Sequence, residues 1–362
     1  MKITGVDVYR LDIPYRETVR VAFGSLTEAN DVVVKIRSDS GQFGTGTTTP
    51  VPPYLGTTQD MIVDAIRYLT PVLVGRNPTD IEGIHAQMER TLGGNQAAKA
   101  GIDIAIYDLI GRELGLPACR LLGGRARDDF VTDRSLSIKD PPAMAADAVK
   151  AMAEGFRAFE VHVGTTPRDD VERIKAVREA VGEGPVIVAD ANQHWSPSEA
   201  ISVIRKLEPY DIMVESPTRG LDNMAQVADA VEAPIIADEA CHTYYDAMEI
   251  VKRKAADAFC IKVIKAGGLY KARKIATVAE AAGLLCRIDG IPGETKISNT
   301  AAVHLGLTIG SLLPGSGVMQ HYYTCREDIV TAGGLAFKDG SVSVDDSPGL
   351  GVTYRENLFR PA

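Results

Sequence analysis

Apolar and polar positions follow two different rhythms along this chain. The first 48 residues alternate in character and are broken by Gly-containing turns, which is typical of an antiparallel meander of strands. Apolar positions at helical spacing follow, and they predict three helices at about 57–73, 78–92 and 95–115. Together these segments predict a small α+β unit.

From about residue 128 onwards, short apolar runs alternate with helical segments, as expected for repeated βα units around a parallel sheet. The tetrapeptide Ser196–Glu199 is a capping box with proline at the first helical turn, so the strand before it must end close to Asp190. About eight strands fit into roughly 190 residues, which agrees with a closed parallel barrel. We expect an α+β domain over residues 1–125, completed by the tail 328–362, and a barrel over 126–327.

Composition narrows the possible functions. The chain has 362 residues, of which 45% are hydrophobic and 24% charged, as is ordinary for a globular enzyme. Its net charge of −9 argues against a nucleic-acid surface. The N-terminus lacks the apolar segment of a signal peptide or membrane span, so we expect a cytoplasmic protein. We expect a homo-oligomer that acts on a small molecule, with neither nucleic acid nor membrane as a partner.

Four polar residues stand at nearly equal steps near the ends of apolar runs: Asp190, Glu215, Asp238 and Lys262, separated by 25, 23 and 24 residues. One strand, one helix and two loops take about that many residues, so each is expected at the carboxyl end of a successive parallel strand. A single acid of this kind is more often a salt-bridge partner or a helix cap. Three carboxylates at the same end of a barrel repel one another unless a cation neutralises them. Oxygen ligands of this kind favour Mg²⁺.

Several motifs then carry a family resemblance. They are AGIDIAIYDLIGRELGLPACRLLGG, VADAN with Asn192, VESP, IADEA with Glu239, KVIKAGG, and the terminal SPGLGV. In these motifs the chain resembles the enolase superfamily, in particular the muconate-lactonizing-enzyme subgroup of the mandelate racemase and muconate lactonizing enzymes. The resemblance implies an α/β fold in which an α+β capping domain covers a modified TIM barrel, (β/α)7β. It also implies Mg²⁺ bound by the three acids at the mouth.

The same resemblance implies a chemical theme. Members bind a carboxylate substrate to the metal, remove the proton α to that carboxylate and stabilise the resulting enediolate. This intermediate needs positive charge close to it. A metal ion with an adjacent ammonium group can stabilise it by several kcal/mol. Lys262 is therefore expected to act as acid and base with a lowered pKa, or alternatively as an electrostatic clamp.

One departure from the subgroup concerns the second barrel strand, which usually ends in KxKxG. Here the segment is Glu160-Val161-His162-Val163-Gly164, so His162 stands where the acid/base lysine is expected and Glu160 faces the same side. Histidine is a competent replacement because its pKa lies near working pH, and we predict His162 and Lys262 as the catalytic pair. In the alternative, His162 is a neutral hydrogen-bonding residue, and a single base would favour syn elimination or cycloisomerisation over racemisation.

Other positions have supporting roles in the resemblance. Glu294 matches a recurrent glutamate that holds substrate or a lysine, although it equally fits a cap of the next helix. Lys265 is expected to face a neighbouring acid or loop, and Tyr54 is a candidate substrate contact from a capping-domain loop. Asp289 stands where mandelate racemases have histidine, which argues against that subgroup. The segment 308–319 carries no acid, which argues against binding of a dipeptide ammonium group there.

Three hypotheses follow for the function. The first is a Mg²⁺-dependent isomerase, of the cycloisomerase or racemase/epimerase type, that acts on a small carboxylate. The second is a dehydratase that begins with the same proton abstraction and then expels a β-hydroxyl group. The third is a barrel that binds a metal and a carboxylate with little or no catalysis.

Overall fold

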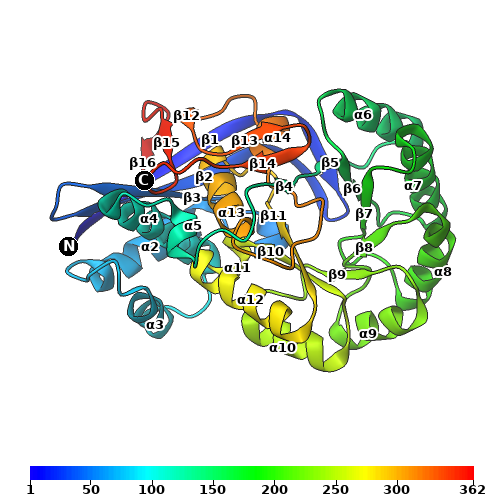
Figure 1. Ribbon diagram of the computed structural model, residues 1–362, viewed down its shortest axis with the longest axis horizontal. Helices are drawn as coiled ribbons and strands as arrows, with labels where there is room; N and C mark the ends of the chain where they lie inside the picture. The colour runs from blue at the N-terminus through cyan, green and yellow to red at the C-terminus, as the bar shows by residue number, and fades with distance from the viewer.

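The N-terminal part of the chain forms an antiparallel sheet covered by helices. The computed structural model, which describes residues 1–362, has β1 and β2 paired along almost their whole length and β3 on the far edge of β2 (Figure 1). The predicted meander and the three predicted helices are confirmed. The elements are β1 (Ile3–Val21), β2 (Gly24–Ser38), β3 (Phe43–Thr48), α1 (Pro52–Leu55), α2 (Gln59–Leu73), α3 (Ile81–Thr91), α4 (Gln96–Leu114) and α5 (Ala118–Leu121).

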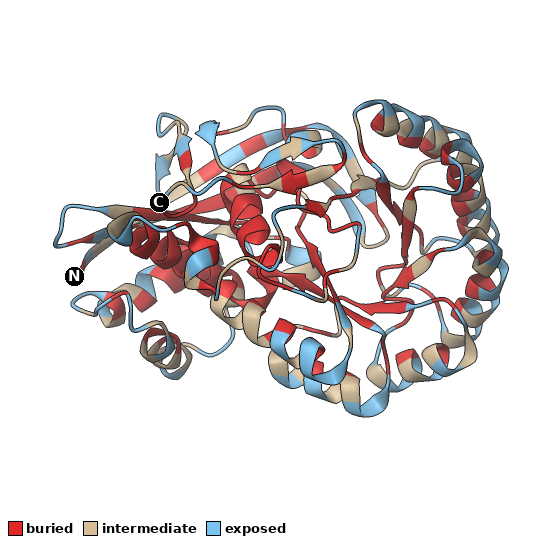
Figure 2. Ribbon diagram, in the orientation of Figure 1, coloured by how far each residue is buried: buried red, intermediate tan, exposed pale blue.

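Helix α4 packs directly against this sheet because β3 carries glycine where the two touch. A Cβ added at Gly46 would lie 2.2 Å from the carbonyl oxygen of Gly101, and one added at Gly44 would lie 2.1 Å from that of Ala105. Residues 97–111 of α4 are all buried, and Figure 2 shows this helix in red against the sheet. The capping unit therefore has its own core, in which Gly44 and Gly46 leave no room for a larger side chain.

Seven parallel strands form the barrel in simple sequential order, each joined to the next through at least one helix that lies outside. The strands are β5 (Arg134–Leu136), β6 (Ala158–His162), β7 (Val186–Asp190), β8 (Met213–Glu215), β9 (Ile235–Ala237), β10 (Ala258–Lys262) and β11 (Leu285–Asp289). The helices between and after them are α6 (Pro141–Ala153), α7 (Pro167–Val181), α8 (Pro197–Leu207), η1 (Glu208–Tyr210), α9 (Leu221–Ala230), α10 (Tyr244–Arg253), α11 (Val263–Ala266), α12 (Leu269–Ala282) and α13 (Lys296–Gly306).

The predicted eighth strand is present only as single bridges. Leu312 and Gly317 bridge to β11, and Ser316 bridges to Thr132, just before β5. These parallel bridges lead from the last strand back to the first and close the barrel. The capping box at Ser196 also forms, and β7 ends at Asp190 as predicted.

The tail returns to both parts of the molecule. After α14 (Gln320–Thr324), two short strands pair with each other, two more extend from β4, and the last pairs with β1 through Pro361 and Arg360. These strands are β12 (Val330–Gly333), β13 (Ala336–Lys338), β14 (Ser341–Ser343), β15 (Val352–Tyr354) and β16 (Arg360–Pro361), with β4 at Phe130–Val131. We propose residues 1–125 with the tail 328–362 as the capping unit, and residues 126–327 as the barrel.

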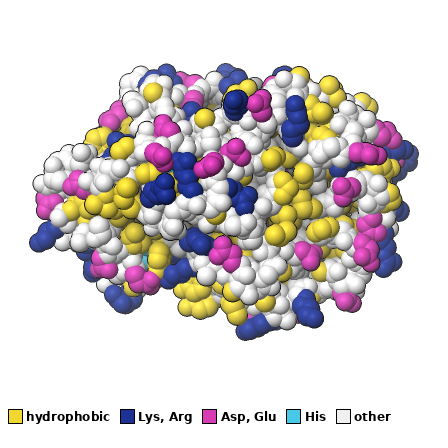
Figure 3. Space-filling view, viewed as in Figure 1, with side chains coloured by type: hydrophobic (Ala, Val, Ile, Leu, Met, Phe, Trp, Pro, Cys, Tyr) yellow, Lys and Arg dark blue, Asp and Glu magenta, His cyan; other side chains and the backbone are white.

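Charged side chains of both signs are interspersed over the face of the molecule drawn in Figure 3. None of the helices combines the length and the apolar character needed to cross a membrane.

Candidate active site

One pocket lies where the capping sheet meets the carboxyl ends of the barrel strands. Its capping-unit side is mostly apolar, with the side chains of Val19, Val21, Phe23, Val51 and Tyr54. Its barrel side is charged and polar, with Glu160, His162, Asp190, Asn192, Lys262 and Asp289. A substrate in this pocket therefore meets ionic groups on one side and hydrophobic groups on the other.

The three acids that were predicted from their equal spacing lie at the ends of successive strands. Asp190 and Glu215 are direct partners across β7 and β8, and Asp238 follows immediately after β9. All three side chains are buried. Asp190 accepts hydrogen bonds from the backbone N–H (2.8 Å) and the side-chain amide (2.7 Å) of Asn192. Burial raises the pKa of Asp190 well above its usual range, and the charges of Glu215 and Glu239 raise it further.

Glu215 supplies a test of whether a cation fits here. Its Oε2 accepts from Arg287 at 2.7 Å, whereas its Oε1 is buried and has no hydrogen-bond partner. Burial raises the pKa of Glu215 well above its usual range despite the nearby Arg287. A buried carboxylate oxygen without a partner, on the strand between those that lead to Asp190 and Asp238, suits a hard divalent cation with oxygen ligands.

Asp238 is held differently from the other two acids. Lys262 Nζ lies 2.8 Å from its Oδ2, Lys265 Nζ lies 2.5 Å from its Oδ1, and the Tyr54 hydroxyl donates at 2.9 Å. Burial raises the pKa of Asp238, but the two lysines outweigh burial and lower it below its usual range. The prediction that Lys265 faces a neighbouring acid is confirmed, and Tyr54 reaches the same carboxylate.

The structure does not gather the three acids into one compact cluster. The two groups whose ligand atoms lie within 4.8 Å of one another are Glu160–His162–Asp190 and Glu215–Cys260–Asp289. Each contains one of the predicted ligands, and Asp238 belongs to neither. The assignment of all three to a single ion therefore stays a proposal.

Lys262 reaches into the pocket from the end of β10. Its ammonium lies 2.8 Å from Asp238 Oδ2 and 3.0 Å from Asp289 Oδ2. Burial acts to lower the pKa of Lys262, but these two carboxylates outweigh it and raise the pKa well above its usual range. This direction is opposite to the lowered pKa expected from the sequence, because two acids lie beside the ammonium.

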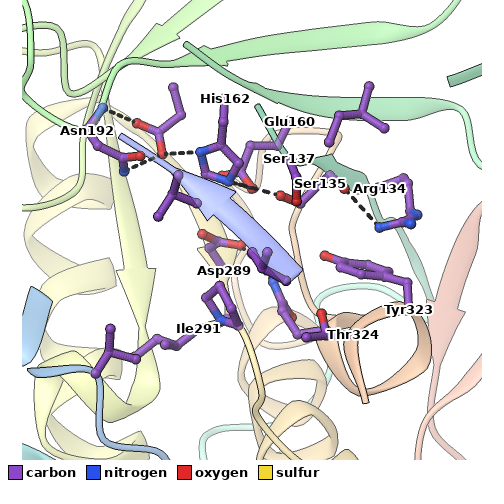
Figure 4. Close-up of a pocket in the computed structure, with 18 of the residues that line it drawn as sticks. Arg134, Ser135, Ser137, Glu160, His162, Asn192, Asp289, Ile291, Tyr323 and Thr324 are labelled. Carbon is purple, nitrogen blue, oxygen red and sulfur yellow. Dashed lines mark hydrogen bonds and ion pairs between the residues drawn. The ribbon is translucent and has the colours of Figure 1, made fainter. Parts of the chain in front are cut away.

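His162 reaches the pocket from the end of β6, between groups on three neighbouring strands. Its Nε2 lies 3.1 Å from Ser135 Oγ and 3.6 Å from Glu160 Oε2, and its Nδ1 lies 3.5 Å from Asp190 Oδ2. Figure 4 shows this row from Asn192 through His162 to Ser135. Burial lowers the pKa of His162, although Glu160 acts to raise it. The neutral imidazole is thus favoured, as a proton acceptor requires.

Arg287 is a residue of the site that was not predicted from the sequence. It lies on β11 with none of its side chain exposed, and its guanidinium contacts four carboxylates, those of Asp133, Glu160, Glu215 and Asp289. One signal was available: Arg287 and Asp289 are two apart in the apolar run LLCRIDG, so both face the same side of the strand. An arginine that points into a barrel must have acids around it.

The remaining candidates support the mouth of the barrel. Asn192 joins Asp190 to Glu239, whose Oε1 accepts from its amide at 3.2 Å. Glu294 accepts from the backbone N–H of Ile291 at 2.9 Å and from the amide of Asn299 at 3.1 Å. Burial raises the pKa of Glu294 to about 8. Glu294 does not line the pocket or contact a lysine, and the N-cap residue of α13 is Thr295, so it stabilises the loop before that helix.

Comparison with known proteins agrees with this architecture. Residues 4–123 match the family model described as "Mandelate racemase / muconate lactonizing enzyme, N-terminal domain", and residues 143–358 match "Enolase C-terminal domain-like". The chain is 33% identical to N-succinyl-L-Arg/Lys racemase from Bacillus cereus, over 99% of this chain and 97% of the relative. It is 31% identical to cis-3-hydroxy-L-proline dehydratase from Roseibium aggregatum, with 98% and 96% covered.

A solved structure gives the same result for the fold. The dipeptide epimerase from Cytophaga hutchinsonii, complexed with Mg and D-Ala-L-Val, superimposes with a TM-score of 0.94 at 34% identity, covering 99% of this chain and 97% of that one. Magnesium in that relative agrees with the Mg²⁺ dependence expected from the sequence. These relatives catalyse reactions, so the hypothesis of a barrel with little catalysis is set aside. The chain is an enzyme and belongs to the mandelate racemase/muconate lactonizing enzyme family of the enolase superfamily.

Proposed function

We propose that the protein is a Mg²⁺-dependent racemase or epimerase, or a related isomerase, that removes the proton α to a carboxylate. Asp190, Glu215 and Asp238 are proposed as the metal ligands. His162 and Lys262 are proposed as the two groups that carry the proton. The substrate is a small carboxylate whose remaining part lies against the apolar side of the pocket.

The observation that carries this proposal is the placement of the two bases. His162 ends β6, the second strand of the barrel, and Lys262 ends β10, the sixth. Strands four apart in a closed eight-stranded barrel face each other across its axis. The three strands between them lead to the three acids. A substrate held at those acids therefore has one proton carrier on each side, as inversion of a carbon centre requires.

Each residue then has a definite task. Mg²⁺ at the acids would hold the substrate carboxylate and stabilise the negative charge that develops on it. His162 accepts the α-proton at one of its ring nitrogens, with Glu160 and Ser135 beside Nε2 and Asp190 beside Nδ1. Lys262, held protonated by Asp238 and Asp289, donates a proton to the opposite side. In the reverse direction the two groups exchange roles.

Deuterium exchange tests this assignment directly. In D₂O with Mg²⁺, the wild-type enzyme is expected to exchange the α-proton of both enantiomers of a substrate, found by screening N-acyl amino acids, amino acids and hydroxy acids. His162→Asn is expected to keep exchange with one enantiomer only and Lys262→Ala with the other, and both lose racemisation. Exchange of both enantiomers by either variant would remove that residue from the mechanism.

The alternative of a dehydratase keeps a specific observation in its favour, because one relative of similar identity carries that name. The first step is shared, and the outcomes differ in mass. Loss of water from a β-hydroxy acid identifies a lyase, whereas deuterium uptake at an unchanged formula identifies an isomerase.

Several relatives are named as dipeptide epimerases, but we propose a dipeptide as a less favoured substrate of this chain. The segment 308–319, which forms the eighth barrel position, has no acid to bind a dipeptide ammonium group. A screen in which dipeptides exchange faster than all N-acyl amino acids would reverse this choice. A cytoplasmic location and a homo-oligomeric state stay predictions.

A further inference from the structure

The barrel interior contains a single buried arginine in an unusual setting. Arg287 Nη2 lies 2.5 Å from Asp133 Oδ2 and 3.2 Å from Glu160 Oε1, and Nη1 lies 2.7 Å from Glu215 Oε2. Its Nε donates to the carbonyl oxygen of Gly315 at 3.0 Å. The side chain is fully buried. A buried guanidinium is costly unless its donors are satisfied by well-placed acceptors, and here all three nitrogens have one.

Arg287 holds one oxygen of each key carboxylate and leaves the other for the active site. In Glu215, Oε2 accepts from Arg287 while Oε1 is buried without a hydrogen-bond partner. In Glu160, Oε1 faces Arg287 while Oε2 lies 3.6 Å from His162. A carboxylate anchored at one oxygen cannot rotate freely, so the direction of its second oxygen is fixed.

The charge of Arg287 complements the residues of strand β6. The second barrel strand, β6, ends in Glu160 and His162 and carries no lysine or arginine. Without a buried cation, Glu160, Glu215 and Asp133 would repel one another in the barrel interior. Arg287 brings a permanent positive charge to the same interior from the seventh strand. Its planar fork reaches several carboxylates at once, which a lysine ammonium does not do with the same geometry.

We propose that Arg287 is a positioning residue that supplies, from β11, the positive charge among the buried carboxylates of the barrel interior. It orients Glu215 toward the metal and Glu160 toward His162. This inference rests on the proposed function for the roles of Glu215 and His162. It goes beyond that function by naming a residue that touches neither substrate nor proton and yet sets the geometry of both halves of the site.

Three variants test the proposal, with Mg²⁺ affinity measured by calorimetry as the first readout. Arg287→Met removes the charge at similar length and is expected to weaken Mg²⁺ binding tenfold or more, about the loss seen when the partner of a metal ligand is removed. Arg287→Lys keeps the charge without the fork and is expected to weaken it about threefold. The double variant Glu160→Lys/Arg287→Met moves the positive charge from β11 to β6.

The double variant is expected to recover Mg²⁺ affinity to within about threefold of wild type while turnover stays low, because His162 has lost Glu160. A purely structural role would move the thermal midpoint of unfolding without this separation of metal binding from turnover. If Arg287→Met does not fold, the Lys variant and the double variant still decide the question. Wild-type affinity in Arg287→Lys together with no recovery in the double variant would overturn the proposal.

The matched control is Arg178→Met. Arg178 is also buried, does not line the pocket, and donates to the backbone carbonyls of Tyr210, Gly182, Pro185 and Asp211. Its loss is expected to lower the thermal midpoint and leave Mg²⁺ affinity unchanged. If Arg287 variants weaken Mg²⁺ binding but wild-type enzyme exchanges no α-proton, the proposed function fails and the positioning role stands. The reverse outcome, exchange in wild type with unaltered Mg²⁺ affinity in all three variants, removes this inference alone.

Discussion

His162 owes its orientation to side chains from three neighbouring strands. Ser135 comes from β5, Glu160 from β6 itself, and Asp190 from β7. Each lies within 3.6 Å of one ring nitrogen, and the ring is hydrogen-bonded at Nε2, whereas Nδ1 is buried without a hydrogen-bond partner. The contact with Ser135 therefore contributes to the orientation of the ring.

At this scale we predict the effect of Ser135→Ala. Removing the hydroxyl leaves Nε2 with only the longer contact to Glu160, so the ring is less well oriented. The lost hydrogen bond is worth about 1 kcal/mol, which corresponds to a decrease in kcat of about fivefold with KM nearly unchanged. Steady-state kinetics measure this. Ser137→Ala is the control, because Ser137 lines the same pocket without a side-chain hydrogen bond to His162. Equal losses in both variants would contradict the prediction.

Single residues were predicted from the sequence where spacing alone decides position. Asp190, Glu215 and Lys262 lie at strand ends because the βα repeat has a nearly constant length. Their partners were not predicted, since contacts such as Arg287 with Asp133 cross the barrel interior and depend on how neighbouring strands are shifted relative to one another. The raised pKa of Lys262 has the same origin, because Asp289 lies on the adjacent strand.

Elements of the fold followed the hydrophobic pattern closely, with one informative exception. The helices of the capping unit and the capping box of α8 begin within a few residues of the predicted positions. The eighth barrel strand does not form a regular ladder, although its segment TIGSLLPGSGVM is apolar. Glycine and proline within that segment reduce the number of residues that can pair continuously, so only isolated bridges remain.

The contact of β3 with α4 gives the prediction for this scale. In Gly46→Ala, the added methyl group would meet the carbonyl oxygen of Gly101, and either the strand or the helix must shift. We expect a loss of about 3 kcal/mol in the free energy of unfolding, in the upper range for overpacking of a core. Chemical denaturation checks it. Gly184→Ala is the control, because a Cβ there meets nothing within 4 Å, and a similar loss in both would contradict the packing argument.

At the scale of the whole molecule, the site lies between two units that must stay together. The pocket takes its apolar side from the capping sheet and its charged side from the barrel. The buried acids of the barrel repel one another, and this repulsion opposes folding. A cation bound at these acids would therefore stabilise the folded chain, in addition to holding the substrate carboxylate.

We accordingly expect Mg²⁺ to raise the thermal midpoint of unfolding. At a free concentration 100 times the dissociation constant, binding only to the folded protein stabilises it by about 2.7 kcal/mol. Differential scanning calorimetry with and without a chelator measures the shift. Glu215→Gln is expected to abolish it. Glu17→Gln, at the outer rim of the same pocket and paired with Lys139, is expected to retain it. A full shift in Glu215→Gln would exclude this residue as a ligand.

The weak closure of the barrel also bears on how the chain reaches its native state. The Thr132 hydroxyl donates to the carbonyl oxygen of Ser316, at 2.7 Å and across 184 positions of sequence. The meander of the capping unit, by contrast, forms between strands that are adjacent in the chain. A non-local contact requires a long loop to close first, which costs conformational entropy. Such contacts therefore form late. The active site would then be assembled last, in the same slow event that seals the barrel.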